Sequence, residues 1–387
     1  SLLGDCWATR ENDMSEMGRA AVFRGVGNPF EIAEYAVPDP GPRDLVVKIE
    51  RTNICGSDLH IWRGDTDLAR MGLTYGIVLG HEMTGRVHAL GGKVRSDSLG
   101  QPLKEGDSVV YAYYCPCSRC LPCLKGDEHM CMASLSSPVR PCEMPPHFLG
   151  GFADYYYVKG RQAVFKAPAG VEPELVAGAN CALSQVIYGL EQANLRFGDS
   201  VVVQGAGGLG LFACAVAKEM GAGQVIAIDG IEARLDLARS FGADEVISIA
   251  EVEDPRERVS RVQSLTGGAG ADVVVEVVGI PEVVPEGIRM LARGGRYLEL
   301  GNINPKKTYK ADPSLLVGQN RSIVGVSLYP PYTLKQALDF LVRARDRYPF
   351  EKLLSHAYPL DQIDKAFQEA DAFSSQPGSV VRASVVP

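Results

Sequence analysis

The stretch VVVQGAGGLGLFACAVAKEMG, residues 201–221, places a glycine-rich turn between an apolar run and a helical pattern. Its glycines at 205, 207 and 210 follow the pattern G-x-G-x-x-G, which alone is weak evidence because glycines are common. The context is more specific, since residues 201–203 predict a buried strand and the alanine-rich residues 211–220 predict a helix. A strand, such a turn and a helix together are typical of a dinucleotide-binding unit.

Each glycine has a physical reason in such a unit. The first permits the tight turn, the second lets the backbone approach a pyrophosphate, and the third lets helix and strand pack closely. The helix N-terminus adds N–H groups and partial positive charge for phosphates. The alternative is a glycine-rich turn without a ligand. We favour binding, and we predict cofactor contacts from Gly205, Gly207, Gly208, Leu209 and Gly210.

An acidic residue at the end of the next apolar run bears on the choice of cofactor. Asp229 lies in VIAIDG (225–230), nineteen residues after Gly210. A carboxylate there can accept both hydroxyls of an adenosine ribose and would repel a 2′-phosphate, which favours NAD over NADP. Its alternative role is to cap a turn at the strand end. Arg234 either stacks on adenine or is a solvated charge on the following helix.

Outward from this unit, short apolar runs alternate with helical stretches from about residue 199. Six such runs lie at 200–205, 224–229, 244–249, 271–279, 295–301 and 322–326. Helical patterns lie between most of them, for example at 210–221 and 232–242. Strands that alternate with helices predict a doubly wound parallel sheet, so the fold class is α/β.

The rest of the chain has a different character. Up to about residue 180 it is rich in Gly and Pro, with β-like runs at 44–54, 106–114 and 152–160 that predict an all-β region. The polar loop 93–106 has no core pattern and no evident role. After residue 330 we expect two amphipathic helices, at 333–348 and 360–373, and then a β-like run at 379–386.

Length and charge set the broad class. A chain of 387 residues is too long for one hydrophobic core, which predicts two domains. The net charge of −8, without a long basic run, argues against nucleic acid as a partner. No apolar run reaches the roughly 18 residues that a membrane span needs. Residues 1–17 lack the plan of a signal peptide, so we expect a flexible tail and a cytoplasmic protein with reduced cysteines.

Half of the ten cysteines fall in CPCSRCLPCLKGDEHMC, residues 115–131. Four have the spacing C-x2-C-x2-C-x7-C and suit a closed tetrahedral zinc site: Cys117, Cys120, Cys123 and Cys131. We interpret Cys115 as a thiol that binds no metal, because we expect a strand that points it elsewhere. The alternative, a disulfide-bonded lobe, is disfavoured in a reducing compartment.

A second group of metal-binding residue types lies in NICGSDLHIW (53–62), GHEMTG (80–85) and GANCALSQ (178–185). A soft thiolate and an imidazole begin a zinc site, and three protein ligands with an open fourth position make such a site catalytic. Any one of these residues alone is more readily a buried thiol or a satisfied histidine. Together they predict a reactive metal centre built from Cys55, Ser57, Asp58, His60, His81, Glu82 and Cys181.

In their order along the chain, CGSDLH, GHE, the four-cysteine lobe and GAGGLG resemble the zinc-dependent medium-chain alcohol dehydrogenases, which include polyol and threonine dehydrogenases. The resemblance covers nearly the whole chain, from about Arg19 to the end. It implies a GroES-like, partly open β-barrel catalytic domain of residues 18–182 and 328–387, with a structural-zinc lobe at 115–133. It further implies an inserted Rossmann domain at 183–327, two zinc ions per chain and NAD as the cofactor.

The resemblance also assigns roles at the reactive centre. It places the catalytic zinc on Cys55, His81 and Cys181, and the structural zinc on the four-cysteine lobe. Glu82 would sit behind the metal. Asp58 would accept a hydrogen bond from the second nitrogen of His81 and so orient that ligand.

Two residues match the family's proton relay, and one matches a cofactor contact. The alcohol proton is expected to leave through Ser57 and His60 while a hydride passes to the nicotinamide. Arg382 matches an arginine that reaches the cofactor pyrophosphate, and its alternative is a plain strand charge. The complete ligand set excludes a zinc-free quinone reductase. It also disfavours the alternative of another class, a non-catalytic nucleotide-binding structural protein on the same fold.

Alignment by motif places five residues around the substrate cleft, each of which has ordinary core packing as its alternative: Trp62, Tyr113, Phe148, Leu149 and Ile303. A polyol would leave hydroxyls unpaired on such a surface, and threonine would need a partner for its carboxylate. We therefore expect a medium-sized or cyclic apolar secondary alcohol, with polyol or threonine dehydrogenase as the alternatives. The family's dimers and tetramers imply a homodimer or homotetramer.

Overall fold

The computed structural model describes residues 16–66, 68, 74–134, 139–301, 307–353, 356–373 and 382–387. Ile303 therefore lies outside the described residues, as does most of the predicted tail. The expectation that the tail extends to residue 17 is wrong, because strand β1 begins at Met17. The backbone carbonyl of Glu16 already accepts a hydrogen bond from the N–H of Val37 at 2.8 Å, which joins this end of the chain to the fold.

A six-stranded parallel sheet contains all six apolar runs, in the spatial order β11-β10-β9-β12-β13-β14. This order confirms the doubly wound prediction, because the chain starts in the middle, grows to one edge and then returns to build the other. The strands are β9 (Ser200–Gln204), β10 (Gln224–Asp229), β11 (Glu245–Ser248), β12 (Ala271–Glu276), β13 (Leu291–Glu299) and β14 (Ser322–Gly325).

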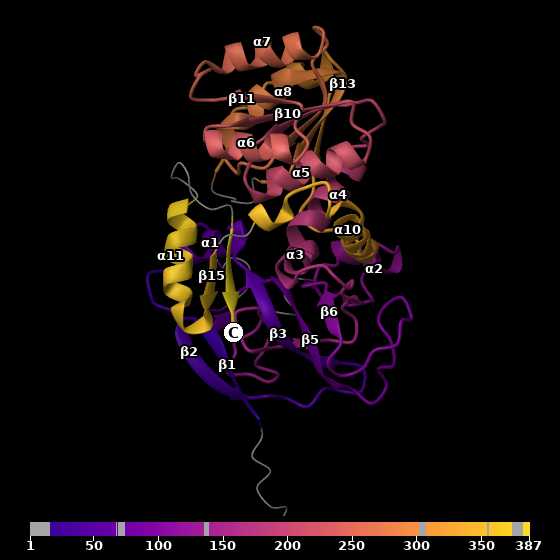
Figure 1. The fold of residues 1–387 in the computed structure, drawn as a ribbon, viewed down its shortest axis with the longest axis vertical. Coiled ribbons are helices and arrows are strands. Elements are labelled where there is room, and N and C mark those ends of the chain that lie inside the picture. The colour runs from indigo at the N-terminus through magenta and orange to yellow at the C-terminus, as the bar shows by residue number, and fades with distance from the viewer. Residues whose placement is uncertain are drawn as a thin grey trace, which may run out of the picture.

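The helices of this lobe pack around that sheet (Figure 1). They are α5 (Gly208–Glu219), α6 (Glu232–Ser240), α7 (Pro255–Leu265), α8 (Val284–Met290) and the short α9 (Ser314–Val317). Residues 210–217 of α5 are all buried, which explains why its sequence is apolar on every side. The glycine loop joins β9 to α5, and Gly205 has φ +98°, a conformation that favours glycine.

The other strands form two mainly antiparallel sheets in the second lobe (Figure 1). The larger has the order β15-β16-β3-β5-β6-β8, with β7 paired to β3, and the smaller has the order β2-β1-β4. Strands β15 and β16 come from the C-terminal end of the chain and lie beside β3, so both ends of the sequence build this lobe. The domain boundaries near 183 and 328 stay a prediction.

The strands of this lobe are β1 (Met17–Phe23), β2 (Glu31–Ala36), β3 (Leu45–Asn53), β4 (Ile77–Val78), β5 (Glu82–Leu90), β6 (Ser108–Tyr111), β7 (Tyr155–Val158), β8 (Val164–Lys166), β15 (His356–Pro359) and β16 (Ala383–Val386). Its helices are α1 (Gly56–Trp62), α2 (Leu121–Leu124), α3 (Pro173–Gly178) and α11 (Ile363–Phe373). The π-helical segment η3 (Ala179–Leu183) leads into α4 (Ser184–Gln192), against which α10 (Pro331–Ala344) packs.

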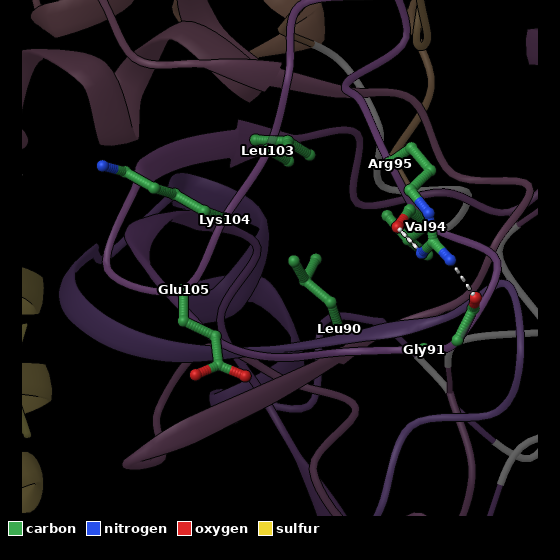
Figure 2. A pocket seen from close by; sticks show the side chains of 8 residues that line it. Leu90, Gly91, Val94, Arg95, Leu103, Lys104 and Glu105 are labelled. Carbon is green, nitrogen blue, oxygen red and sulfur yellow. Dashed lines mark hydrogen bonds between the residues drawn. The ribbon is translucent and has the colours of Figure 1, made fainter.

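The polar loop 93–106 is ordered by one buried carboxylate. Asp97 accepts hydrogen bonds from the backbone N–H groups of Leu99 and Gln101, each at 2.9 Å, and of Lys166 at 3.2 Å. An open hollow lies beside this loop, with Leu90, Arg95 and residues 103–105 around it (Figure 2). The hollow lies near Leu90, at the opposite end of β5 from Glu82. At roughly 3.4 Å per residue, these two ends of the strand are about 27 Å apart.

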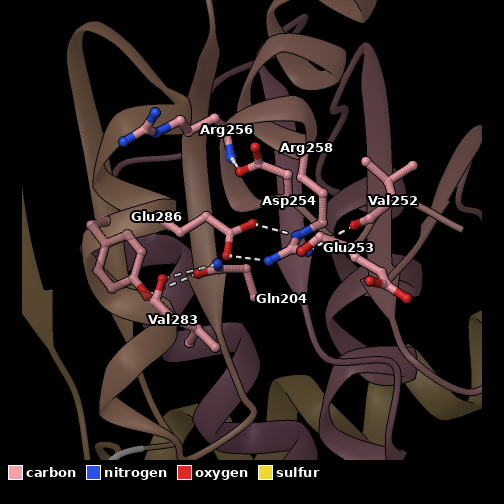
Figure 3. A network of polar contacts seen from close by, with 9 residues as sticks. Gln204, Val252, Glu253, Asp254, Arg256, Arg258, Val283 and Glu286 are labelled. Atoms are coloured by element: carbon pink, nitrogen blue, oxygen red, sulfur yellow. Dashed lines mark hydrogen bonds and ion pairs between the residues drawn. The ribbon is translucent and has the colours of Figure 1, made fainter. Parts of the chain in front are cut away.

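A polar network ties the helices α7 and α8 together beside the parallel sheet (Figure 3). The guanidinium of Arg258 donates to both carboxylate oxygens of Glu286, at 2.7 and 2.9 Å, and both side chains are at least nine-tenths buried. Gln204, the last residue of β9, donates to the carbonyl of Val283 and accepts from Tyr297. The residue before the glycine loop is therefore held to both α8 and β13.

Candidate active site and metal centres

Asp58 connects three parts of the predicted reactive centre. It lies in the first turn of α1, whose N-cap is Cys55, and one carboxylate oxygen accepts from the backbone N–H of Cys55 at 3.0 Å. The other accepts from the N–H of Gly80 at 3.2 Å and lies 3.3 Å from Nδ1 of His81. With a side chain only 3% exposed, Asp58 holds the Cys55 backbone and the His81 ring in fixed relative positions.

His81 and Glu82 occupy the turn into β5 and its first residue. Burial alone would lower the pKa of His81, but the carboxylate of Asp58 and the thiol of Cys55 raise it well above its ordinary value. Glu82 is fully buried and forms an ion pair with Arg382. Burial raises the pKa of Glu82 to about 8 despite that arginine, and among the described residues its Oε1 atom has no hydrogen-bond partner.

Cys181 lies on an unusual stretch of backbone. It is the central residue of the π-helical segment η3, and π turns inside helices are frequent at functional sites. The preceding residue, Asn180, accepts a hydrogen bond from the hydroxyl of Tyr329 through its carbonyl. Its side chain donates to the carbonyl of Tyr111 at 3.1 Å. These contacts anchor the backbone of the segment next to strand β6.

The ligand atoms of Cys55, His81, Glu82 and Cys181 all lie within 4.8 Å of one another. A hydrogen bond from Cys181 is the main reason that the pKa of Cys55 lies well below its usual range. The same bond, together with burial, raises the pKa of Cys181. Two sulfurs and an imidazole nitrogen are ligands that suit zinc, and a carboxylate oxygen of Glu82 lies in the same group. The residues present therefore fit a zinc ion.

The four-cysteine lobe forms a second such group, on α2 and the turn around it. The Sγ atoms of its cysteines also lie within 4.8 Å of one another, and those of Cys120 and Cys123 are 3.4 Å apart. Backbone N–H groups, first that of Arg119, lower the pKa of Cys117 to about 6. Thiols this close cannot all ionise without a cation between them, so this donor set also fits a zinc ion.

Cys115 is separate from that group. Its side chain is 1% exposed, and it is absent from the metal-binding groups found among the described residues. The expectation that it lies on a strand is wrong, because β6 ends at Tyr111 and Cys115 follows in an irregular segment. The backbone N–H of Cys115 donates to the carbonyl of Ser134 at 3.0 Å, which closes the base of the lobe.

The two predicted relay residues lie on the same helix, α1, three positions apart, and so share one face of it. The hydroxyl of Ser57 is 3.4 Å from Nε2 of His81, the ring nitrogen that does not face Asp58. Nδ1 of His60 is 3.0 Å from a carboxylate oxygen of Asp65, which keeps the ring oriented. Sequence reasoning missed Asp65, because it lies beyond the end of α1, where helical spacing no longer indicates a contact.

The predicted cofactor residues gather at the carboxyl ends of β9 and β10. Among the described residues, nothing beyond its chain neighbours and its own helix lies within 4 Å of the position where a Cβ on Gly207 would stand, so the backbone is open to a ligand there. Asp229 accepts from the backbone N–H groups of Ala206 at 2.7 Å and Ile231 at 2.9 Å. Arg234 lies 4.0 Å from Asp229 with a side chain 17% exposed, so a solvated surface charge is the wrong interpretation. Leu209 is partly buried against the core.

Arg382 lies between the cofactor loop and the metal-binding group. Its Nε atom would be 2.8 Å from a Cβ on Gly208, and its guanidinium pairs with Glu82. It precedes β16, so a plain strand charge is also the wrong interpretation. The sequence did not indicate the pairing with Glu82, which is 300 positions away along the chain.

One of the five residues predicted to surround the substrate cleft lies elsewhere in the structure. Phe148 is fully buried and packs on Tyr35 and Tyr155, so it belongs to the hydrophobic core and does not line a cleft. Leu149 is 8% exposed, and Trp62 is partly buried with its ring 6.0 Å from that of Phe367. Tyr113 is partly buried and lies 5.0 Å from the His81 ring, centroid to centroid, so it does adjoin the site.

Comparisons with known proteins agree with this arrangement. Residues 41–169 match a family model described as the alcohol dehydrogenase GroES-like domain, and residues 208–343 match one described as zinc-binding dehydrogenase. The chain is 36% identical over 342 residues to 5-exo-hydroxycamphor dehydrogenase of Pseudomonas putida, covering 88% of this chain and 92% of that protein. It is 32% identical over 352 residues to L-threonine 3-dehydrogenase of Bacillus licheniformis, covering 90% and 94%.

The fold has a solved counterpart. The crystal structure of an alcohol dehydrogenase from Thermotoga maritima matches with a TM-score of 0.87 at 26% identity, covering 96% of this chain and all of that one. Fold, site and relatives define a zinc-binding oxidoreductase with a GroES-like domain and a Rossmann-type sheet. The chain belongs to the zinc-dependent medium-chain alcohol dehydrogenase family. Among the residues described, no helix has the length and apolarity to cross a membrane.

Proposed function

We propose that this chain is an NAD-dependent zinc dehydrogenase that interconverts a medium-sized or cyclic apolar secondary alcohol and its ketone. The observation that carries the proposal is the meeting of Cys55, His81 and Cys181 beside the hydroxyl of Ser57. These side chains come from three separate segments of the chain, and a purely structural nucleotide-binding protein has no need to bring them together. Two zinc ions per chain follow from the two separate donor sets.

The residues near the first set have distinct tasks. When bound, zinc would polarise the substrate oxygen as a Lewis acid, and NAD would accept or return the hydride. Ser57 is placed to take the alcohol proton, because its hydroxyl lies against the metal-facing nitrogen of His81. His60, held by Asp65, is placed to receive that proton next and release it to solvent, since its side chain is 19% exposed.

The cofactor proposal rests on the carboxylate at the end of β10. Two backbone N–H groups hold Asp229 in place, so its charge would face the adenosine ribose. Arg234 lies beside that carboxylate and partly offsets its charge, but it remains outside hydrogen-bond range at 4.0 Å. We propose NAD, with a preference over NADP of at least about tenfold in kcat/KM, or 1.4 kcal/mol. Equal use of the two cofactors would contradict this.

The substrate proposal has support from one relative and opposition from another. The relative at 36% identity is named for a bicyclic secondary alcohol, whereas another relative is named for threonine. The ring of Tyr113 near His81 provides apolar contact area, which contributes at about 25 cal/mol per Å² buried. Polyols and threonine are the competing substrates. A homodimer or homotetramer in the cytoplasm remains our prediction.

The deciding experiment follows NADH absorbance with cyclohexanol, 5-exo-hydroxycamphor, sorbitol and threonine as paired substrates. We expect kcat/KM to be highest for one of the two cyclic alcohols. A higher value for sorbitol or threonine would contradict the substrate class while leaving the zinc and hydride chemistry in place. Failure to reduce NAD with any alcohol, in a sample that retains its zinc, would favour the non-catalytic alternative.

A further inference from the structure

One aromatic side chain borders the metal-binding group without taking part in it. The Tyr113 ring lies 5.0 Å from that of His81, at an interplanar angle of 57°. A phenol with an ordinary pKa of about 10 is neutral at physiological pH, so its O–H is available as a hydrogen-bond donor.

The hydroxyl of Tyr113 differs from those of its aromatic neighbours. Tyr114 donates to the carbonyl of Tyr329 at 2.7 Å, and Tyr329 in turn donates to the carbonyl of Asn180. Both hydroxyls thus hold backbone in place. Within the described part of the chain, the Tyr113 hydroxyl forms no hydrogen bond, and its side chain remains partly accessible. A donor in such a position is available to a bound molecule.

We propose that the Tyr113 hydroxyl donates a hydrogen bond to a second, non-reacting oxygen of the substrate and so selects secondary alcohols that also carry a carbonyl or ether oxygen. This inference rests on the function proposed above and narrows its substrate class. A substrate without that acceptor leaves the phenol without a partner on the substrate, and polar groups left unpaired by the wrong substrate are a main source of discrimination. Because Tyr113 keeps some access to water, we expect discrimination of about tenfold.

The test compares the zinc-loaded wild type with Tyr113→Phe, using NAD and two alcohols of one ring size, 4-hydroxycyclohexanone and cyclohexanol. Phenylalanine keeps the ring packing on His81 and removes only the hydroxyl. In the wild type we expect the hydroxyketone to exceed cyclohexanol about tenfold in kcat/KM. In Tyr113→Phe that ratio should fall to near one, through a higher KM for the hydroxyketone.

Tyr114→Phe is the matched control, because it removes the neighbouring hydroxyl that bonds the Tyr329 carbonyl. It should lower the melting temperature without changing the ratio between the two alcohols. An unchanged ratio in Tyr113→Phe, or an equal loss of ratio in Tyr114→Phe, would overturn the assignment while the proposed function stands. A wild type that oxidises neither alcohol would overturn both.

Discussion

Two glycines of the same loop should respond differently to an added methyl group. A Cβ on Gly210 would lie 1.8 Å from the carbonyl oxygen of Gly205, well inside any real contact distance. The backbone must then move, at a cost of about 3 kcal/mol. Gly207 has φ −72° and ψ −172°, which alanine adopts without strain, and among the described residues nothing beyond its chain neighbours and its own helix lies within 4 Å of its Cβ position. Alanine there should leave the free energy of unfolding nearly unchanged, because the gain of about 0.4–1 kcal/mol from a less flexible unfolded chain offsets the weaker N-cap of α5.

NAD binding should be more sensitive to alanine at Gly207 than to alanine at Gly210. The open space at Gly207 is where a pyrophosphate would approach the backbone, so Gly207→Ala should weaken NAD at least about tenfold, or 1.4 kcal/mol. Its melting temperature without cofactor should not fall. Gly210→Ala should lower the melting temperature of the apo-protein by about 6 °C, at roughly 2 °C per kcal/mol for a large chain. The assays are thermal unfolding with and without NAD, and calorimetric titration of NAD.

Gly92→Ala is the matched control, because Gly92 also has open space around its Cβ position and lies far from the loop. It should leave both melting temperature and NAD affinity near the wild-type values. The reasoning is refuted if Gly207→Ala binds NAD as the wild type does. It is also refuted if Gly207→Ala loses as much thermal stability as Gly210→Ala, since the empty space would then have no connection with the ligand.

Three further predictions concern the metals, the relay and pH. Cys120→Ala should reduce two zinc ions per chain to one and lower the melting temperature, whereas Cys55→Ala should abolish turnover; elemental analysis and activity assays check both. Ser57→Ala should lower kcat by roughly 10²- to 10⁴-fold, and His60→Ala by less, because small buffer bases can replace an outer shuttle. Burial and the neighbouring Glu299 raise the pKa of Glu276 to about 8 from 4.5. The stability that protonated Glu276 contributes should therefore be fully present below pH 4.5 and be lost as the pH rises through 8. Glu276→Gln should flatten that pH profile in thermal unfolding.

Each of these has a contradicting outcome. One zinc ion per chain with full activity would remove one of the two donor sets. Wild-type kcat in Ser57→Ala, under conditions where proton transfer limits the rate, would show that the relay starts elsewhere. A wild-type unfolding profile that does not decline between pH 6 and 9 would mean that Glu276 is not protonated in the native state.

Local spacing was sufficient wherever the ligands of a site lie within one short segment. The cysteines of the lobe span residues 117–131, so a single turn of chain can wrap them around an ion, and the structure brings their sulfurs together. The glycine loop is equally local, because strand, turn and helix follow one another directly. The six apolar runs predicted six strands, since a parallel sheet buried on both faces requires continuous apolar sequence.

Contacts between distant segments were accessible only through family likeness or not at all. Phe148 was assigned to the cleft by alignment with the family's motifs, yet its ring turns into the core against Tyr155. No periodic pattern indicates the contact of Asp65 with His60, because Asp65 follows the end of a helix. None indicates the pairing of Arg382 with Glu82 either, because these residues are far apart along the chain.

The sequence by itself determined the α/β class, the strand-turn-helix unit and which residue types were available for a metal. Apart from the family resemblance, nothing in the sequence indicated that Cys181 meets Cys55 and His81. The tertiary structure decided it, because that meeting depends on how the π-helical segment packs against β5 and β6. The physical reason lies in the range of the interactions. Hydrophobic periodicity and turn chemistry act over a few residues and can be read locally, whereas side chains brought together from separate elements are positioned by the packing of the whole core.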